Sequence, residues 1–166
     1  NDALTNNTAA NNTAVGKDAL LSNTTGTENT AVGATALDAL TTASNNTAIG
    51  YDALSANQTG EGNTSVGSHS LQANTGSGYN TAVGHNALKV SSTGNSNTAV
   101  GQGAGDAVTT SSNNVLVGND SGGSLTTGGS NTAVGKDTIS QATTTSQLVA
   151  MGFKALTACT GTGNNA

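Results

Sequence analysis

The side chains best suited to chemistry are two histidines, one cysteine and nine acidic residues. His69 and His85 could serve as a general base or as metal ligands, but neither has a second catalytic group placed beside it by the sequence. Four aspartates lie multiples of 17 residues apart and would share one column of a repeating structure: Asp18, Asp52, Asp120 and Asp137. A calcium ladder on that column would need further oxygen ligands at each site. We therefore predict no enzyme activity, no metal site and no cofactor.

Other reactive or modifiable residues have simpler interpretations. Cys159 stands where the repeat usually has a small or amide side chain, so we expect a buried small residue. The glycines do not have Walker or dinucleotide-binding spacing before a helix. A predicted contact surface for a cell-surface saccharide or protein receptor comprises Tyr51, His69, His85 and Tyr79. Spacings close to 17 residues place Tyr51, His69 and His85 near one corner on successive units of a repeating structure. Glycosylation sequons follow from an Asn- and Thr-rich composition at Asn6, Asn11, Asn23, Asn45, Asn57, Asn63 and Asn119.

The composition excludes several classes of protein. Thr, Gly, Asn and Ser make up 91 of the 166 residues, whereas Leu, Val, Ile and Phe make up 26. Such a chain cannot build an ordinary apolar core, yet its 8% charged content and lack of Pro are not those of a disordered tail. Four scattered lysines and a net charge of -5 argue against nucleic acid binding. No apolar run is long enough to insert in a membrane.

A strict internal period explains how such a chain can be ordered. The motif NTAVG, or a close variant, recurs every 17 residues without insertion or deletion. A unit of this length is too short for a helical pair, and one short β-prone run followed by Gly fits one coil of a β-solenoid. At about 4.8 Å per coil, nine coils would form a rod about 43 Å long. The repeated glycines are Gly16, Gly33, Gly50, Gly67, Gly84, Gly101, Gly118, Gly135 and Gly152.

We number each coil so that this Gly occupies position 6. Gly is expected there because the backbone turns with positive φ or approaches a neighbouring backbone closely. Position 2 is Asn in all coils but the last, and stacked Asn side chains can hydrogen-bond their copies above and below. These predicted ladder residues are Asn12, Asn29, Asn46, Asn63, Asn80, Asn97, Asn114 and Asn131.

The pattern also suggests which columns face inward. Thr and Val exchange at position 3, so we expect this column to point inward beside Val at position 5, with Asn and Ala at positions 2 and 4 facing outward. The twelve charged residues of the coils occupy positions 1, 7, 8, 11 and 17, so the other twelve positions should be buried or stacked. Where position 10 loses its Leu, at Gly105 and Gly122, position 13 gains Val108 and Leu125, as if to fill the same space.

Apolar residues are too few for the chain to order itself easily alone. Adjacent apolar pairs, Ala-Val at positions 4 and 5 and Ala-Leu at positions 9 and 10, would put apolar groups on both faces of a strand. One face can fill the coil while the other meets a neighbouring chain. We therefore predict a homo-oligomer.

The segments NTAVGKDAL, NTAIGYDAL and NTAVGHNAL resemble the NTAIGxxAL repeats of phage tail-fibre and bacterial surface-fibre proteins. They are similar, more distantly, to the shorter repeats of trimeric autotransporter adhesin heads. The resemblance covers essentially the whole chain. It implies a left-handed parallel β-roll, a homotrimer, and a location outside the cell, on its surface or on a virion.

These observations together predict an all-β solenoid of nine 17-residue coils in one repeat domain, residues 1–166. We expect a partial coil at 1–10, full coils over 11–163 and the start of a further coil at 164–166, as in a segment of a longer fibre. The predicted function is a structural shaft or adhesive segment that presents a surface for host-cell or substrate attachment.

Two other functions compete with this one. An ice-binding solenoid would need outward Thr-x-Thr rows, but the Thr pair at positions 14 and 15 is adjacent and position 3 is expected to face inward. A polysaccharide-active enzyme would need carboxylates clustered on neighbouring coils, which the sequence lacks.

Overall fold

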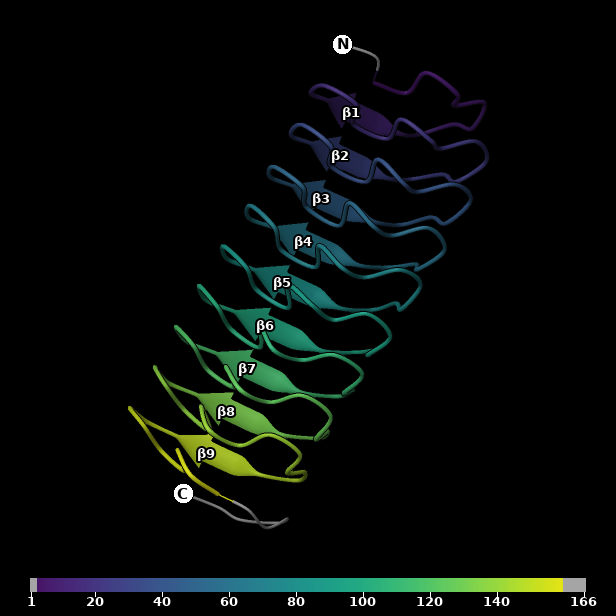
Figure 1. The fold of residues 1–166 in the computed structure, drawn as a ribbon. Coiled ribbons are helices and arrows are strands. Elements are labelled where there is room, and N and C mark those ends of the chain that lie inside the picture. Colours follow the sequence, from purple (N-terminus) through teal and green to yellow (C-terminus); the bar gives the residue numbers. More distant parts are fainter. Residues whose placement is uncertain (1–2, 160–166) are drawn as a thin grey trace.

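The computed structural model describes residues 3–159, which form one stack of coils (Figure 1). Each coil contributes one three-residue strand to a single sheet whose order is β1 to β9 along the chain. The rest of each coil consists of turns and bends. The strands are β1 (Thr13–Val15), β2 (Thr30–Val32), β3 (Thr47–Ile49), β4 (Thr64–Val66), β5 (Thr81–Val83), β6 (Thr98–Val100), β7 (Val115–Val117), β8 (Thr132–Val134) and β9 (Val149–Met151).

All neighbouring strands are parallel, and each residue pairs with the residue 17 positions along. Thr81, for example, lies beside Thr98, and Val83 lies beside Val100. The predicted all-β parallel solenoid is therefore confirmed, and within residues 3–159 it contains no helix. The described residues accordingly include no helix that could span a membrane. The predicted last residues of the ninth coil, 160–163, and the predicted start of a further coil, 164–166, lie outside the described residues.

The strand faces are opposite to those predicted from the sequence. Ala at position 4 and Asn at position 2 are buried in the coil from β2 onward, whereas Thr at position 3 and Val at position 5 lie on the outside, partly or largely exposed. The buried columns are positions 2, 4, 9, 10, 13 and 16, so the expectation of twelve buried or stacked columns was also too high. Positions 9 and 10 both point inward because they lie in a turn, where strand alternation does not apply.

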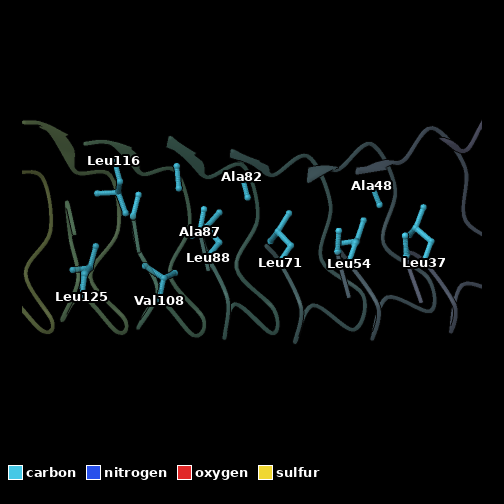
Figure 2. Packing of buried hydrophobic residues seen from close by; sticks show 14 of the residues in the cluster. Leu37, Ala48, Leu54, Leu71, Ala82, Ala87, Leu88, Val108, Leu116 and Leu125 are labelled. Carbon is cyan, nitrogen blue, oxygen red and sulfur yellow. The ribbon is translucent and has the colours of Figure 1, made fainter. Parts of the chain in front are cut away.

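The narrow cross-section of the coil explains this inversion. Leu at position 10 enters the interior from the turn opposite the strand; Leu37, Leu54, Leu71 and Leu88 form one continuous row (Figure 2). Little space remains on the strand side, so the inward strand residue is normally Ala, as Ala82 illustrates. Val fits on the outside, where its branched side chain suits a strand and meets no size limit.

The interior of coils 6 and 7 is filled differently, as the sequence pattern predicted. Val108 and Leu125 are fully buried and continue the row where Gly105 and Gly122 replace Leu (Figure 2). The structure adds a third member, Leu116 of β7, which takes the place of the usual Ala. A Cβ at Gly105 would lie 2.8 Å from Leu116 Cδ1, and one at Gly122 would lie 2.9 Å from Cδ2. Leu116 therefore occupies the space of both missing leucines.

Turns are held by hydrogen bonds to the next coil rather than by strand pairing. Leu at position 10 has φ near +50°, as in Leu37 (52°) and Leu54 (55°), a conformation that costs energy for a residue with a side chain. Its amide donates to the next coil, from Leu37 N to Ala53 O over 3.2 Å. Burial of the Leu side chain offsets the conformational cost.

The predicted Asn ladder runs through the interior. The side-chain Oδ1 of Asn80 accepts from the backbone N of Asn97 (2.9 Å) and from its Nδ2 (3.2 Å). Asn80 Nδ2 in turn donates to the carbonyl of Gly94 (2.9 Å), at position 16 of its own coil. The same pattern recurs along the column, and the ladder ends on the backbone N of Leu148, which donates to Asn131 Oδ1. Each Asn thus satisfies buried backbone groups of two coils.

Replacing one ladder residue should be costly. We expect Asn80→Ala to lower the free energy of unfolding by about 3 kcal/mol, because the amide of Asn97 and the carbonyl of Gly94 lose buried partners. Urea unfolding monitored by circular dichroism measures the change. Asn12→Ala, at the partly exposed first step of the ladder, is the matched control and should cost about 1 kcal/mol. Equal losses for the two variants would contradict a cooperative buried ladder.

Candidate functional site: the outer face of the sheet

The outward side chains of the nine strands form a continuous surface that we call the outer face, consisting of positions 3 and 5 of every coil. It has no charged residue, and it carries Thr, Val, Ile and Met alone. Several of its apolar side chains are well exposed, from 36% at Val100 to 67% at Met151. Six of the ten most exposed large hydrophobic residues belong to it: Val15, Ile49, Val100, Val115, Val149 and Met151. The position 5 column is an uninterrupted apolar strip, and an exposed strip of this kind is typical of an interaction surface.

Strict register makes the outer face regular. Each outward Thr pairs with Thr or Val of the next coil, and each outward Val pairs with Val, Ile or Met. The columns therefore run straight along the rod, with about 4.8 Å between coils and about 6.6 Å between positions 3 and 5 of one strand. The exchange of Thr and Val at position 3, which predicts an inward column, is tolerated instead because this column faces outward.

Three of the predicted contact residues lie together at one edge of the outer face, on coils 3 to 5. We call Tyr51, His69 and His85 the aromatic corner. The Tyr51 and His69 rings meet edge to face with centroids 5.3 Å apart, and the His69 and His85 centroids are 6.1 Å apart. Tyr51 is 54% exposed, and His85 is exposed as well. The predicted gathering of these three residues is confirmed; contact with a saccharide or a receptor stays a prediction.

Asp52 contacts His69 of the aromatic corner. Its Oδ2 lies 3.6 Å from His69 Nδ1 and accepts a hydrogen bond from Gln72 Nε2 (3.2 Å). Its Oδ1 accepts from the hydroxyl of Thr35. His69 Nδ1 is buried and has no hydrogen-bond partner. This arrangement orients the ring of His69 between Tyr51 and His85.

Tyr79 lies apart from the other three, at the opposite edge of the outer face. It precedes β5, whereas the aromatic corner follows the strands. Its side chain is 70% exposed and its ring lies against Gly62, where an added Cβ would be 3.0 Å from Cδ1. Gly62 is the one glycine at position 1 of the nine coils, so the ring can rest on the backbone.

The aspartate column has members on coils 1, 3, 7 and 8, which are Asp18, Asp52, Asp120 and Asp137. Residues 3–159 contain no group of three or more His, Cys, Asp or Glu placed to hold a metal ion. Asp106 and Asp120 each have a carboxylate oxygen within 4 Å of the position that a Cβ on Gly103 would take. Burial raises the pKa of Asp106, and the charge of Asp120 raises it further, while Lys89 lowers it.

This raised pKa predicts a weak pH dependence of stability. The folded chain holds the Asp106 proton more tightly than the unfolded chain, so its contribution to stability falls as pH rises from 3.8 through the raised pKa. Asp106→Asn should therefore increase the free energy of unfolding at pH 7, by less than about 0.5 kcal/mol because the carboxyl is partly exposed and screened. At pH 3 it should have no effect. Unfolding at both pH values measures this, and an equal gain at pH 3 would contradict it.

The seven sequons divide between internal and exposed positions, and Asn6 is exposed while Asn119 is partly exposed. Asn23, Asn57 and Asn63 are fully buried and hydrogen-bonded, which makes these sequons inaccessible in the folded chain, whereas Asn11 and Asn45 are exposed. Cys159 is partly buried against the apolar core.

Sequence reasoning missed the outer face itself. The signal that could have revealed it was residue size: the Ala column is the one that a crowded interior requires, and the Val column is the one that it cannot accommodate.

No family model, curated protein or solved structure matches this chain. The fold and the outer face therefore define its class directly: a tandem-repeat parallel β-solenoid with one exposed, uncharged sheet face.

Proposed function

We propose that the chain is a non-enzymatic structural shaft or adhesive segment of an extracellular or virion fibre. The observation that carries this proposal is the outer face, a straight and uncharged strip along all nine strands that the chain itself leaves uncovered. A shaft needs a rigid rod, which the inter-coil backbone and Asn ladders supply, and a surface for assembly with other chains. Attachment to a host cell or substrate would then occur at the free flanks or at an associated tip.

Assembly into a homotrimer is part of this proposal. Three copies can bury their outer faces around a common axis parallel to the rods, so that each apolar strip meets two others. Resemblance of the NTAVGKDAL repeats to fibre and adhesin-head repeats supports the trimer, and it also supports a left-handed winding of the coil. The charged residues at positions 8, 11 and 17 would stay in solvent on the outside of such a trimer, whereas Lys17, Glu28 and Lys136, at positions 1 and 7, would lie at the rim of the interface.

The mass in solution tests the assembly. Light scattering coupled to size-exclusion chromatography should give three times the chain mass of 15.9 kDa. Val83→Glu places a charge on the outer face and should convert the particle to a monomer while circular dichroism still shows a β fold. Val83→Thr, which keeps the shape and matches residues at position 3, should stay trimeric. Thr110→Glu, on an exposed turn away from the outer face, is a second control. A wild-type monomer would overturn the proposal.

Ice binding is a second candidate, favoured by one specific observation. Thr at position 3 faces outward, which removes the objection that this column is inside, although position 5 carries Val, Ile or Met in place of a second Thr. The outer face thus carries Thr-x-Val rows in a flat, regular array. Ice recrystallisation and thermal hysteresis assays separate the two functions. Activity of the wild type that Thr81→Tyr abolishes would support ice binding, whereas a trimeric chain without activity would exclude it.

A further inference from the structure

Aromatic and histidine side chains gather on one short section of the rod. The chain has two Tyr, two His, one Phe and no Trp, and four of these five residues lie on coils 3 to 5. They occupy both edges of the outer face: Tyr79 lies on one, and the aromatic corner lies on the other. On coil 5 the row across the face reads Tyr79, Thr81, Val83 and His85.

The aromatic side chains on both edges are ordered by contacts within the chain itself, before any partner binds. Tyr79 rests against the backbone at Gly62, which leaves its outer side free. At the other edge, His69 is held between Tyr51, His85 and Asp52. Side chains ordered in this way lose little conformational entropy when a partner arrives.

We infer that the two edges form an aromatic clasp between copies of this chain, in which Tyr79 of one copy packs against His85 and its neighbours on the next. The inference rests on the proposed homotrimer. In a closed ring of identical chains the contact is heterologous, so one edge of each copy meets the opposite edge of the next. Because rotation about an axis parallel to the rods preserves height, Tyr79 meets the residues of its own level. His85 follows the same strand, β5, and is therefore the expected neighbour.

A second copy fits this surface better than a small ligand does. Sugar and other ligand sites are usually concave, and residues 3–159 contain no pocket. Tyr79 and the aromatic corner lie at opposite ends of the strand, so one small molecule would meet one edge at a time. Positions 1, 3, 5 and 7 of the nine coils supply 36 residues, which exceeds the 20 to 30 per side of a standard protein interface.

Disulfide trapping tests the clasp. In a Cys159→Ser background, Tyr79→Cys with His85→Cys should give covalent dimers and trimers on a non-reducing gel after mild oxidation. The matched control pairs Tyr79→Cys with Asn119→Cys, which also follows a strand but lies two coils further along. The control should cross-link at least tenfold less. Equal cross-linking of the two pairs, or none in either, would overturn the clasp.

Oxidative tyrosine cross-linking provides a second measurement. In the wild type Tyr51 lies two coils from the level of Tyr79, the same separation as in the Asn119 control, so little dityrosine is expected between copies. His85→Tyr places a tyrosine at the level of Tyr79, so covalent oligomers containing dityrosine are expected if the clasp forms, and adding Tyr79→Phe should abolish them. Their absence from a trimeric His85→Tyr sample would count against the clasp.

The mass measurement keeps the two proposals distinguishable. A monomeric wild type overturns both the shaft assembly and the clasp. A trimer that fails to cross-link through Tyr79 and His85 overturns the clasp alone and leaves the shaft standing. If such a trimer bound immobilised saccharides and Tyr51→Ala removed the binding, the aromatic corner would belong to a saccharide instead, and the clasp would be wrong.

Discussion

Gly84→Ala is expected to lower the free energy of unfolding by about 4 kcal/mol or more. Gly84 has φ +138°, which a residue with a side chain rarely adopts and which costs about 1 to 3 kcal/mol. A Cβ would also collide with the backbone of Gly101 in the next coil, at 2.6 Å from its carbonyl carbon. Neither backbone can move without breaking the hydrogen bonds from Gly84 N to Val66 O and from Gly101 N to Val83 O.

Gly152→Ala is the matched control for this prediction. Gly152 occupies the same position of its coil and has φ +114°, but nothing lies within 4 Å of an added Cβ. It should therefore show the conformational cost without the collision, about 1 to 3 kcal/mol. Urea unfolding of both variants measures the difference. In a stack stabilised by nearest-neighbour contacts, Gly84→Ala should also split unfolding into two transitions. Equal destabilisation by the two variants would contradict the steric account of the Gly column.

Leu116→Ala should cost about 3 to 5 kcal/mol. The side chain is fully buried and fills the space that Leu occupies at position 10 of the other coils. Its removal leaves a cavity beside both Gly105 and Gly122, and such cavities retain most of their energetic penalty. Ala at this position is harmless elsewhere, as Ala31 and Ala48 illustrate, because Leu is present opposite. Chemical unfolding monitored by circular dichroism measures the loss.

A double-mutant cycle isolates the compensation. Gly122→Leu alone should cost about 1 to 3 kcal/mol, because its Cβ would lie 2.9 Å from Leu116 Cδ2. Combined with Leu116→Ala it restores the usual pair of coil residues and should recover most of the stability. The backbone permits this, since Gly122 has φ +69° and Leu54 holds φ +55° at the same position. Additive losses in the double variant would show that the two sites fill separate spaces.

Most of the fold could be predicted from the 17-residue period. A spacing that never varies requires coils of equal length, and Gly and Asn columns within it require corners and ladders at fixed points. The filling of space around Gly105 and Gly122 was also visible, although Leu116 was missed because a larger side chain at position 4 has no obvious cause in the sequence. The grouping of Tyr51, His69 and His85 followed from their positions on successive coils.

The direction of the strand faces could not be predicted in the same way. Alternation divides Asn80, Thr81, Ala82 and Val83 into two sets but carries no information on which set is inside. The exchange of Thr and Val at position 3 predicts that positions 3 and 5 face inward, and because the structure places both outward, the sequence pattern also missed the candidate site.

The amino-acid sequence was thus sufficient to define the period, the parallel in-register stack and the residues that form its ladders. Repeats of identical length and similar sequence place each residue beside its equivalent in the next coil. Tertiary structure alone decided which face of the sheet is exposed. Leu37 and its counterparts enter from the turn opposite the strand and fill a narrow interior, so that Ala fits beneath the sheet and Val does not. The uncharged outer face, on which the proposed function depends, is a consequence of that competition for space.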